Sequence, residues 1–287
     1  MKLTGRRESS NVDDRRGMST AGIGGIGIGG VIVAALMAWL MGGNPIEALQ
    51  SAMEQQANVT TQTGNREFTV EEEELAKFSR QVLAGTEDVW TEVFREMGRE
   101  YVPPRMVLYT GGVKTACGNG SAAMGPFYCS GDQCLYIDLS FFTSMKKQLG
   151  ADGDFAYAYV IAHEVGHHVE YLLGTLSKAH NQMSRMSTTD ANKISVRLEL
   201  LADFYAGVWA YHDNKMFSSI EDGDIEEAIN CAEVIGDNYL QEKARGYSQP
   251  ESFTHGTSKQ RMKWLKLGLT TGDMSKGNTF ALSDAEL

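Results

Sequence analysis

The chain has 287 residues, of which 42% are hydrophobic and 22% are charged, a composition typical of a globular protein with room for one large domain or two small ones. Its formal net charge is −11. A surface that binds phosphates needs an excess of basic side chains, so we expect no nucleic-acid partner.

The first predicted element is the uncharged segment from Ala21 to Met41, which is long enough to span a bilayer as a helix. Because a span carries its excess of basic residues on the cytoplasmic side, the sequence predicts a signal anchor at 21–41, with residues 1–20 cytoplasmic and the rest of the chain extracytoplasmic. A cleaved signal peptide would have a shorter apolar core and a cleavage site of small residues. The basic residues before the segment are Lys2, Arg6, Arg7, Arg15 and Arg16.

Two further features belong to this part of the chain. Gly25 and Gly29 form a small-xxx-small pair, through which two membrane helices pack together, and self-association is therefore a hypothesis. Residues 42–70 are polar and lack apolar periodicity, which indicates a flexible linker. The globular domain is then predicted to cover residues 71–287.

The domain begins with a helical pattern and continues with strands. Apolar residues recur at helical spacing from Leu75 to Met97, which predicts one long helix or two helices joined at Gly85. Short apolar runs at 105–109 and 134–139, separated by glycine-rich turns, predict two β-strands.

The four cysteines suggest disulfides in a chain that lies outside the cytoplasm. Three pairings are possible. Cys117 with Cys129 is the local pair, which leaves Cys134 for Cys231. A zinc knuckle is the alternative, but the sequence has no C-x2-C pair.

The segment from Asp154 to Gly174 carries the motif His163-Glu164-Val165-Gly166-His167, H-E-x-x-H. Its apolar spacing predicts a helix that ends near Gly174. Positions i and i+4 share one helix face, so His163 and His167 can offer two imidazoles to one metal ion, with Glu164 beside them. The alternative is a buried helix with incidental histidines. The neighbouring His168 points about a quarter turn away.

A third ligand would support the metal site. Glu199 and Asp203 form an E-x-x-x-D pattern on a predicted apolar helix, and a carboxylate flanked by leucines is buried and needs a partner. The combination resembles the gluzincins, the thermolysin-like branch of the zincins. The resemblance implies that Glu199 is the third zinc ligand and that Asp203 accepts a hydrogen bond from the outer nitrogen of a ligand histidine.

The remaining histidines are weaker candidates. The metzincin pattern is excluded because Gly174 and His180 come too late, and His180 and His212 lie in polar, surface-like stretches. His255 lies in a turn before a predicted helix, and thermolysin-like enzymes use a separate histidine to stabilise the oxyanion. His255 is therefore a candidate for that role, ahead of Arg261, with an ordinary loop histidine as the alternative. The helix start is indicated by the capping-box spacing from Thr257 to Gln260.

Long stretches of the chain resemble the bacterial family called "putative neutral zinc metallopeptidase". The resemblance implies an α+β fold: a mainly helical, zincin-like metallopeptidase domain with a small β-sheet, anchored in the bacterial cell membrane by one N-terminal transmembrane helix. Many members have cysteine where Phe204 and Gly277 stand here, which suggests that this chain has exchanged one disulfide for the pair Cys134–Cys231. The stretches are GRRESSNVDDRR, MGPFYC, YIDLSFF, LGADGDFAYAYVIAHEVGHHV, RLELLADFYAGVW and SFTHGTSKQR.

The resemblance implies hydrolysis of a peptide or protein substrate at one Zn2+ ion per chain, held by His163, His167 and Glu199. Glu164 then acts as the general base toward a water molecule. The strand near 136–139 is expected to pair with an extended peptide. The alternative is an envelope scaffold or binding module with a structural zinc site, but such a site needs a fourth protein ligand, and none is well placed.

Overall fold

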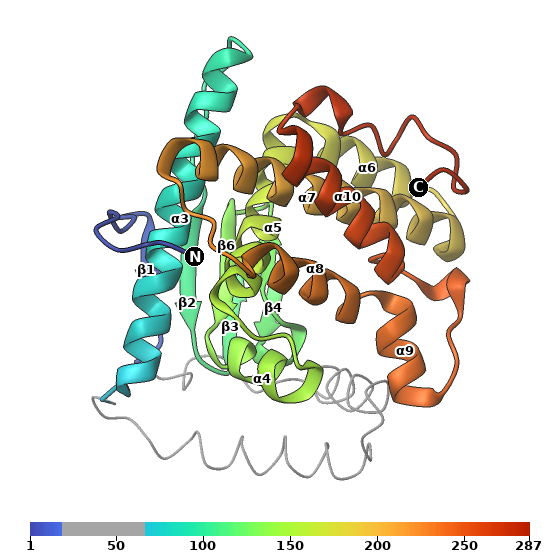
Figure 1. The fold of residues 1–287 in the computed structure, drawn as a ribbon. Coiled ribbons are helices and arrows are strands. Elements are labelled where there is room, and N and C mark those ends of the chain that lie inside the picture. Colours follow the sequence, from blue (N-terminus) through green and yellow to red (C-terminus); the bar gives the residue numbers. More distant parts are fainter. Residues whose placement is uncertain (19–66) are drawn as a thin grey trace.

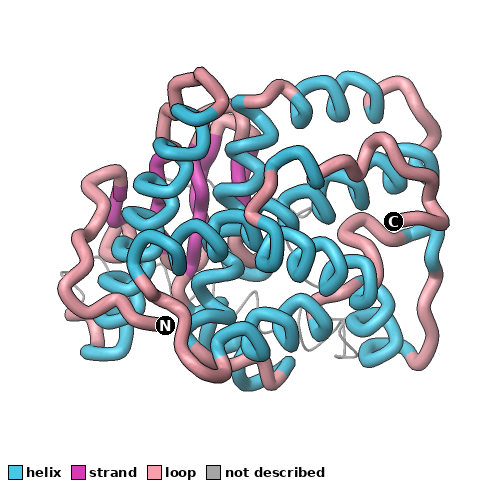
Figure 2. Tube along the Cα trace, turned by 45° about the horizontal axis from the view of Figure 1, so that its top comes forward, coloured by secondary structure: helices cyan, strands magenta, loops and turns pink. Residues whose placement is uncertain are grey.

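The computed structural model of the chain describes residues 1–18 and 67–287. Its strands gather at one side of the molecule and helices make up the rest (Figures 1 and 2). The α-helices of the described residues are α3 (Val70–Glu96), α4 (Ser140–Leu149), α5 (Asp154–Leu172), α6 (Thr175–Met183), α7 (Thr188–Phe217), α8 (Asp224–Val234), α9 (Asp237–Arg245) and α10 (Ser258–Thr271). The strands are β1 (Val12–Asp14), β2 (Arg105–Tyr109), β3 (Gly112–Thr115), β4 (Gly118–Ser121), β5 (Phe127–Cys129) and β6 (Cys134–Asp138). The predicted combination of a mainly helical domain with small sheets is therefore present.

Four strands form the larger sheet, in the order β1-β2-β6-β5. β1, β2 and β6 run parallel, and β5 runs antiparallel to β6. The predicted strand at 105–109 is confirmed as β2, and that at 134–139 as β6. Cys134–Tyr136 of β6 are paired on both sides, with β2 and β5, whereas Ile137 and Asp138 pair with β2 alone within the described part of the chain. The pairing of the strand at 136–139 with an extended peptide therefore stays a prediction. β5 and β1 are the two edge strands of this sheet.

The two faces of this sheet bury different side chains, because successive residues of a strand point to opposite faces. Met106, Leu108, Leu135 and Ile137 belong to the main core with the helices. The opposite face forms a separate cluster with residues of β3 and β5, namely Val107, Tyr109, Val113, Cys129, Cys134 and Tyr136. The sheet thus separates a helical core from a smaller apolar layer.

This separation decides the cysteine pairing. The predicted disulfide Cys117–Cys129 is confirmed. The predicted disulfide Cys134–Cys231 is wrong, and both residues are buried free cysteines. Cys134 lies in the smaller layer, whereas Cys231 on α8 lies in the main core, so the sheet stands between the two thiols.

Helix α3 is one continuous helix, which settles the predicted choice between one helix and two. Gly85 does not interrupt the helix, but a larger residue at this position would not fit. A Cβ atom at this position would lie 2.7 Å from Nη2 of Arg6 and 2.9 Å from Oδ1 of Asp213. The glycine therefore leaves room for an ion pair between the N-terminal segment and α7. The helix begins with a capping box formed by Thr69 and Glu72.

The N-terminal segment is part of the domain, which corrects the predicted membrane topology. β1 pairs with β2, with Val12 opposite Met106, and the Arg6 guanidinium binds the Asp213 carboxylate through two contacts of 2.7 and 2.8 Å. Residues 1–16 and the helical domain pack together (Figure 1), so one membrane span between them cannot hold them on opposite sides.

Across residues 1–18 and 67–287, every helix is too short or too polar to cross a bilayer. The predicted anchor at 21–41, the Gly25/Gly29 pair and most of the predicted linker at 42–70 lie outside the described residues. The predicted single-pass arrangement, with residues 1–20 and the domain on opposite sides of a membrane, is wrong because residues 1–16 pack on the domain.

The ion pair between Arg6 and Asp213 yields a stability prediction. The Asp213 side chain is fully buried, so Arg6→Ala would leave an unpaired buried charge and should lower the free energy of unfolding by about 3–5 kcal/mol. Urea denaturation measures the change. Arg95→Ala is the control, because the Arg95–Glu92 pair is exposed and should leave the midpoint unchanged. A wild-type midpoint for Arg6→Ala would contradict the packing of the N-terminal segment.

Three helices position the candidate site. Helix α5 crosses α7 closely at Gly166, where a Cβ atom would lie 2.9 Å from the carbonyl oxygen of Ala202. A larger residue would push the helices apart. Helix α10 packs along the other side of α7 (Figures 1 and 2). Side chains from all three helices therefore meet around the middle of α7.

Candidate metal centre

Helix α5 carries the two histidines of the H-E-x-x-H motif, and the predicted helix is confirmed. The imidazole rings of His163 and His167 have centroids 4.8 Å apart, because residues four apart lie one above the other on a helix. His163 is buried and His167 is partly buried. The pair therefore presents two nitrogen atoms to the neighbouring helix α7.

Helix α7 supplies the opposing carboxylate. Nε2 of His163 lies 3.1 Å from Oε2 of Glu199, and Nε2 of His167 lies 3.5 Å from Oε1 of the same residue. Ligand atoms of these three side chains all lie within 4.8 Å of one another. The structure thus brings together the three residues that the sequence predicted as metal ligands.

The outer nitrogen of each imidazole is held by a second carboxylate. Nδ1 of His163 lies 2.8 Å from Oδ1 of Asp203, and Nδ1 of His167 lies 2.9 Å from Oε2 of Glu170. Both carboxylates are fully buried. Such contacts fix the ring orientation and leave Nε2 to face a metal ion.

Asp203 is in turn fixed by two further groups. Arg261 donates to it through Nε and Nη2, both at 2.8 Å, and the Tyr159 hydroxyl donates at 2.6 Å. Burial alone would raise the pKa of Asp203, but Arg261 and His163 outweigh it and hold the pKa well below its usual range. The carboxylate therefore stays ionised. Burial lowers the pKa of His163, but Asp203 and Glu199 together raise it to about 9.

The pKa values of Glu164 and Glu199 are shifted in opposite directions, although both residues lie at the same site. Burial raises the pKa of Glu164, opposed by His163 and His167. The pKa of Glu199 is well below its usual value, because the charges of His255 and His167 outweigh the opposite effect of burial. Within the part of the chain that the structure describes, no hydrogen bond holds the Glu164 carboxylate. Of the two carboxylates, that of Glu199 faces the Nε2 atoms of both His163 and His167.

The donor set fits a zinc ion. Two imidazole nitrogens and one carboxylate oxygen are a set found in catalytic zinc sites, which keep the fourth position open. Among the described residues, the group of donors that converge here has three members. A closed structural site would need a fourth, so the arrangement matches a catalytic type of centre.

The predicted oxyanion residue, His255, lies in the turn before α10. Its Nδ1 is 3.2 Å from Oδ1 of Asp237, whose other oxygen accepts the backbone N–H groups of Thr254, His255 and Gly256. The side chain is half exposed. The charge of His255 contributes to the lowering of the pKa of Glu199.

Sequence reasoning missed Glu170 and assigned Arg261 differently. Glu170 follows His167 by three positions, and this spacing on an apolar helix was a usable signal. Arg261 was considered beside His255 as an active-site residue, but the structure places it on Asp203 instead. Its partner is 58 positions away, and no local pattern indicates such a contact.

His168, His180 and His212 do not belong to the group of converging ligand atoms. As expected from its place on the helix, His168 points elsewhere, and its ring nitrogens contact the Tyr128 hydroxyl at 2.9 Å and the Val102 carbonyl at 2.7 Å. His180 is exposed, as predicted. His212 is partly buried and donates to the carbonyl of Gly272.

Comparison with known proteins agrees with this centre. The model of the family described as "Putative neutral zinc metallopeptidase" matches residues 1–280. The chain is 46% identical to the uncharacterized protein YpfJ of Escherichia coli strain K12 over 290 positions, which cover 99% of this chain and 100% of that protein. It is 40% identical over 194 positions to the uncharacterized protein Rv2575 of Mycobacterium tuberculosis strain H37Rv, with 64% of each chain covered. No solved structure matches. The family match spans nearly the whole chain, including the N-terminal segment that packs on the domain. The protein therefore belongs to the family described as "Putative neutral zinc metallopeptidase".

Proposed function

We propose that the protein hydrolyses peptide bonds at one zinc ion held by His163, His167 and Glu199. The observation that carries the proposal is the convergence of two Nε2 atoms and one carboxylate within 4.8 Å, with both outer nitrogens bound to buried carboxylates. A zinc ion bound there would polarise a water molecule and the carbonyl of the scissile bond.

Glu164 is the general base of this proposal. It takes a proton from the attacking water and later passes it to the leaving amine. Its freedom from hydrogen bonds to the described residues and the upward shift of its pKa by burial suit a group that accepts and then returns a proton. A structural zinc site would need neither such a carboxylate nor an open coordination position.

The edge strand β5 is the proposed docking strand for the substrate. It lies against α5, and the Tyr128 hydroxyl binds His168, the residue after the second ligand. Among the described strands, β5 is paired on one side only. An extended peptide that added to its other side would gain backbone hydrogen bonds and would run beside the metal centre.

Cleavage of a diverse peptide mixture tests the proposed function. The purified protein with zinc should cleave a subset of the peptides at reproducible sites, which mass spectrometry reads out. Removal of zinc by a chelator should abolish cleavage, because the ligands alone do not activate water, and added zinc should restore it. Cleavage that persists fully in the metal-free protein would contradict the proposal.

His255 is proposed to stabilise the oxyanion of the transition state. His255→Ala should leave the bound zinc unchanged and should lower kcat about 10²-fold, the effect of losing one such donor. Steady-state kinetics and metal analysis of the same preparation measure both quantities. His180→Ala is the matched control, because His180 is exposed on α6. An unchanged kcat for His255→Ala would leave His255 as an ordinary loop residue.

A further inference from the structure

Three of the four cysteines lie together beside the β5–β6 hairpin. Cys117, in the turn between β3 and β4, is bonded to Cys129 at the end of β5. Cys134, the first residue of β6, is a free thiol, and it is the register partner of Cys129 across the antiparallel strand pair. Cys129 and Cys134 also belong to the same buried cluster. A free thiol therefore lies directly opposite one sulfur of an existing disulfide.

The spacing of opposed strand positions permits a second bridge. Directly opposite residues of an antiparallel pair have Cβ atoms about 4.5–5.5 Å apart, and a disulfide joins Cβ atoms about 3.5–4.5 Å apart. A small adjustment of the hairpin therefore brings Cys134 within bonding distance of Cys129. Cys231, the other free thiol, has no such neighbour, because it lies in the main core and contacts Met145.

We propose that Cys117, Cys129 and Cys134 form a thiol–disulfide exchange site. The Cys134 thiol gives its proton to solvent, and the thiolate attacks Sγ of Cys129. The Cys129–Cys134 bond forms as the Cys117–Cys129 bond breaks, and Cys117 leaves as a thiolate that takes up a proton. One disulfide is lost and one is formed, so the step needs no oxidant and no reductant.

Burial explains which sulfur leaves. Cys117 is exposed, whereas Cys129 is fully buried. A departing thiolate is stabilised by water and destabilised in an apolar layer, so attack at Cys129 with departure of Cys117 is the favoured direction. Burial, together with Asp132, raises the pKa of the Cys134 thiol, opposed by Arg105 and Arg15. Exchange is therefore slow at neutral pH, because little thiolate is present.

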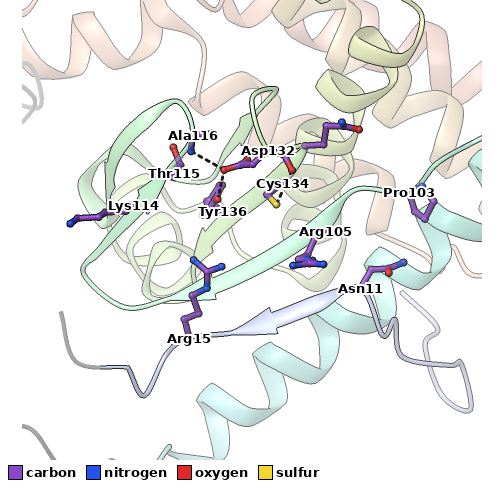
Figure 3. Close-up of a pocket in the computed structure, with 11 residues that line it drawn as sticks. Asn11, Arg15, Pro103, Arg105, Lys114, Thr115, Ala116, Asp132, Cys134 and Tyr136 are labelled. Atoms are coloured by element: carbon purple, nitrogen blue, oxygen red, sulfur yellow. Dashed lines mark hydrogen bonds between the residues drawn. The ribbon is translucent and has the colours of Figure 1, made fainter. Parts of the chain in front are cut away.

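The exchange would change a second feature of the molecule, a cavity of about 620 Å³ on the sheet face that carries this layer. Cys134 and Tyr136 lie on one wall of it, and the β3–β4 turn, with Thr115 and Ala116, lies on another (Figure 3). After exchange the turn would lose its covalent link to β5 and would keep the hydrogen bond from the Ala116 N–H to Asp132, at 2.9 Å. The result is an exposed thiol on a loosened cavity wall, open to modification by thiol-reactive compounds.

Thiol trapping in the full-length protein tests the proposal. The protein is incubated above neutral pH with iodoacetamide and no added thiol, quenched with acid, digested with pepsin without reduction and mapped by mass spectrometry. We expect Cys117 to become alkylated with time while Cys129 and Cys134 are found linked within one peptide. Wild-type protein in which Cys117 stays bridged to Cys129 throughout would overturn the proposal.

Two variants separate exchange from other ways of opening the bridge. In Cys134→Ser, alkylation of Cys117 should be lost, because the attacking thiol is absent. Cys231→Ser is the matched control, because it removes the other buried thiol. In this variant Cys117 should be alkylated at the wild-type rate. Equal alkylation of Cys117 in wild type and Cys134→Ser would also overturn the proposal. If Cys134→Ser does not fold, the disulfide map of the wild-type protein alone decides whether the exchange takes place.

Discussion

Glu164→Gln is expected to retain one zinc ion per chain and to lower the rate of peptide hydrolysis about 10²–10⁴-fold, the usual contribution of a general base. Glutamine has nearly the same shape as glutamate but cannot take a proton from water. The metal should stay, because His163, His167 and Glu199 supply the ligand atoms and Glu164 is not among them. Metal analysis and kinetics on the same preparation give both values.

A second substitution at this position tests whether the activity depends on the carboxylate group. Glu164→Asp keeps the carboxylate but shortens its reach, so its activity should fall between that of the wild type and that of Glu164→Gln. Loss of zinc from Glu164→Gln would mean that Glu164 is a ligand. Wild-type turnover with zinc bound would exclude Glu164 as the base.

Glu199→Ala should lose zinc and with it all metal-dependent hydrolysis. Two imidazoles alone form a poor site, because zinc in proteins takes three or four protein ligands. The change also removes the acceptor at 3.1 Å from Nε2 of His163. Calorimetric titration of the metal-free protein with zinc measures the loss of affinity, and circular dichroism checks that α7 is still folded.

Glu199→Gln distinguishes charge from shape at the same position. It keeps an oxygen donor but loses the negative charge, so zinc affinity should lie between that of the wild type and that of Glu199→Ala. The control on the same helix is Asp190→Asn, near its exposed start, which should bind zinc as the wild type does. If Glu199→Ala binds zinc and turns over normally, the third ligand must be sought elsewhere, for example at His255.

The candidate ligands were predictable from the sequence because their spacing is local. His163 and His167 lie four apart on one helix, and Glu199 and Asp203 lie four apart on another. Helical geometry places each pair on one face whatever the rest of the chain does. Capping boxes and the disulfide across 12 positions between Cys117 and Cys129 are local in the same sense. The approach of α5 to α7 was inferred from family resemblance, and the structure supplies its physical basis at Gly166.

The wrong predictions of the membrane topology and of the second disulfide concern contacts between distant parts of the chain. The basic residues near the N-terminus suggested a cytoplasmic segment before a membrane span, but Arg6 is paired with Asp213, 207 positions away. The disulfide between Cys134 and Cys231 was predicted by elimination, as the pair that remains once Cys117 is bonded to Cys129. The face of β6 on which Cys134 lies points it away from the main core, and elimination does not take account of strand faces.

The amino-acid sequence by itself determined the helices α3, α5, α7 and α10, the strands β2 and β6, the histidine pair and the carboxylate pair, because periodicities of 3.6 and 2 residues are properties of the local backbone. Only the tertiary structure decided that β1 joins β2, that Arg261 fixes Asp203 and that Glu164 makes no hydrogen bond with the described residues. Such contacts depend on where packing places whole elements. A side chain finds its partner across 58 positions, as Arg261 does, only after the core has set the distance between α7 and α10.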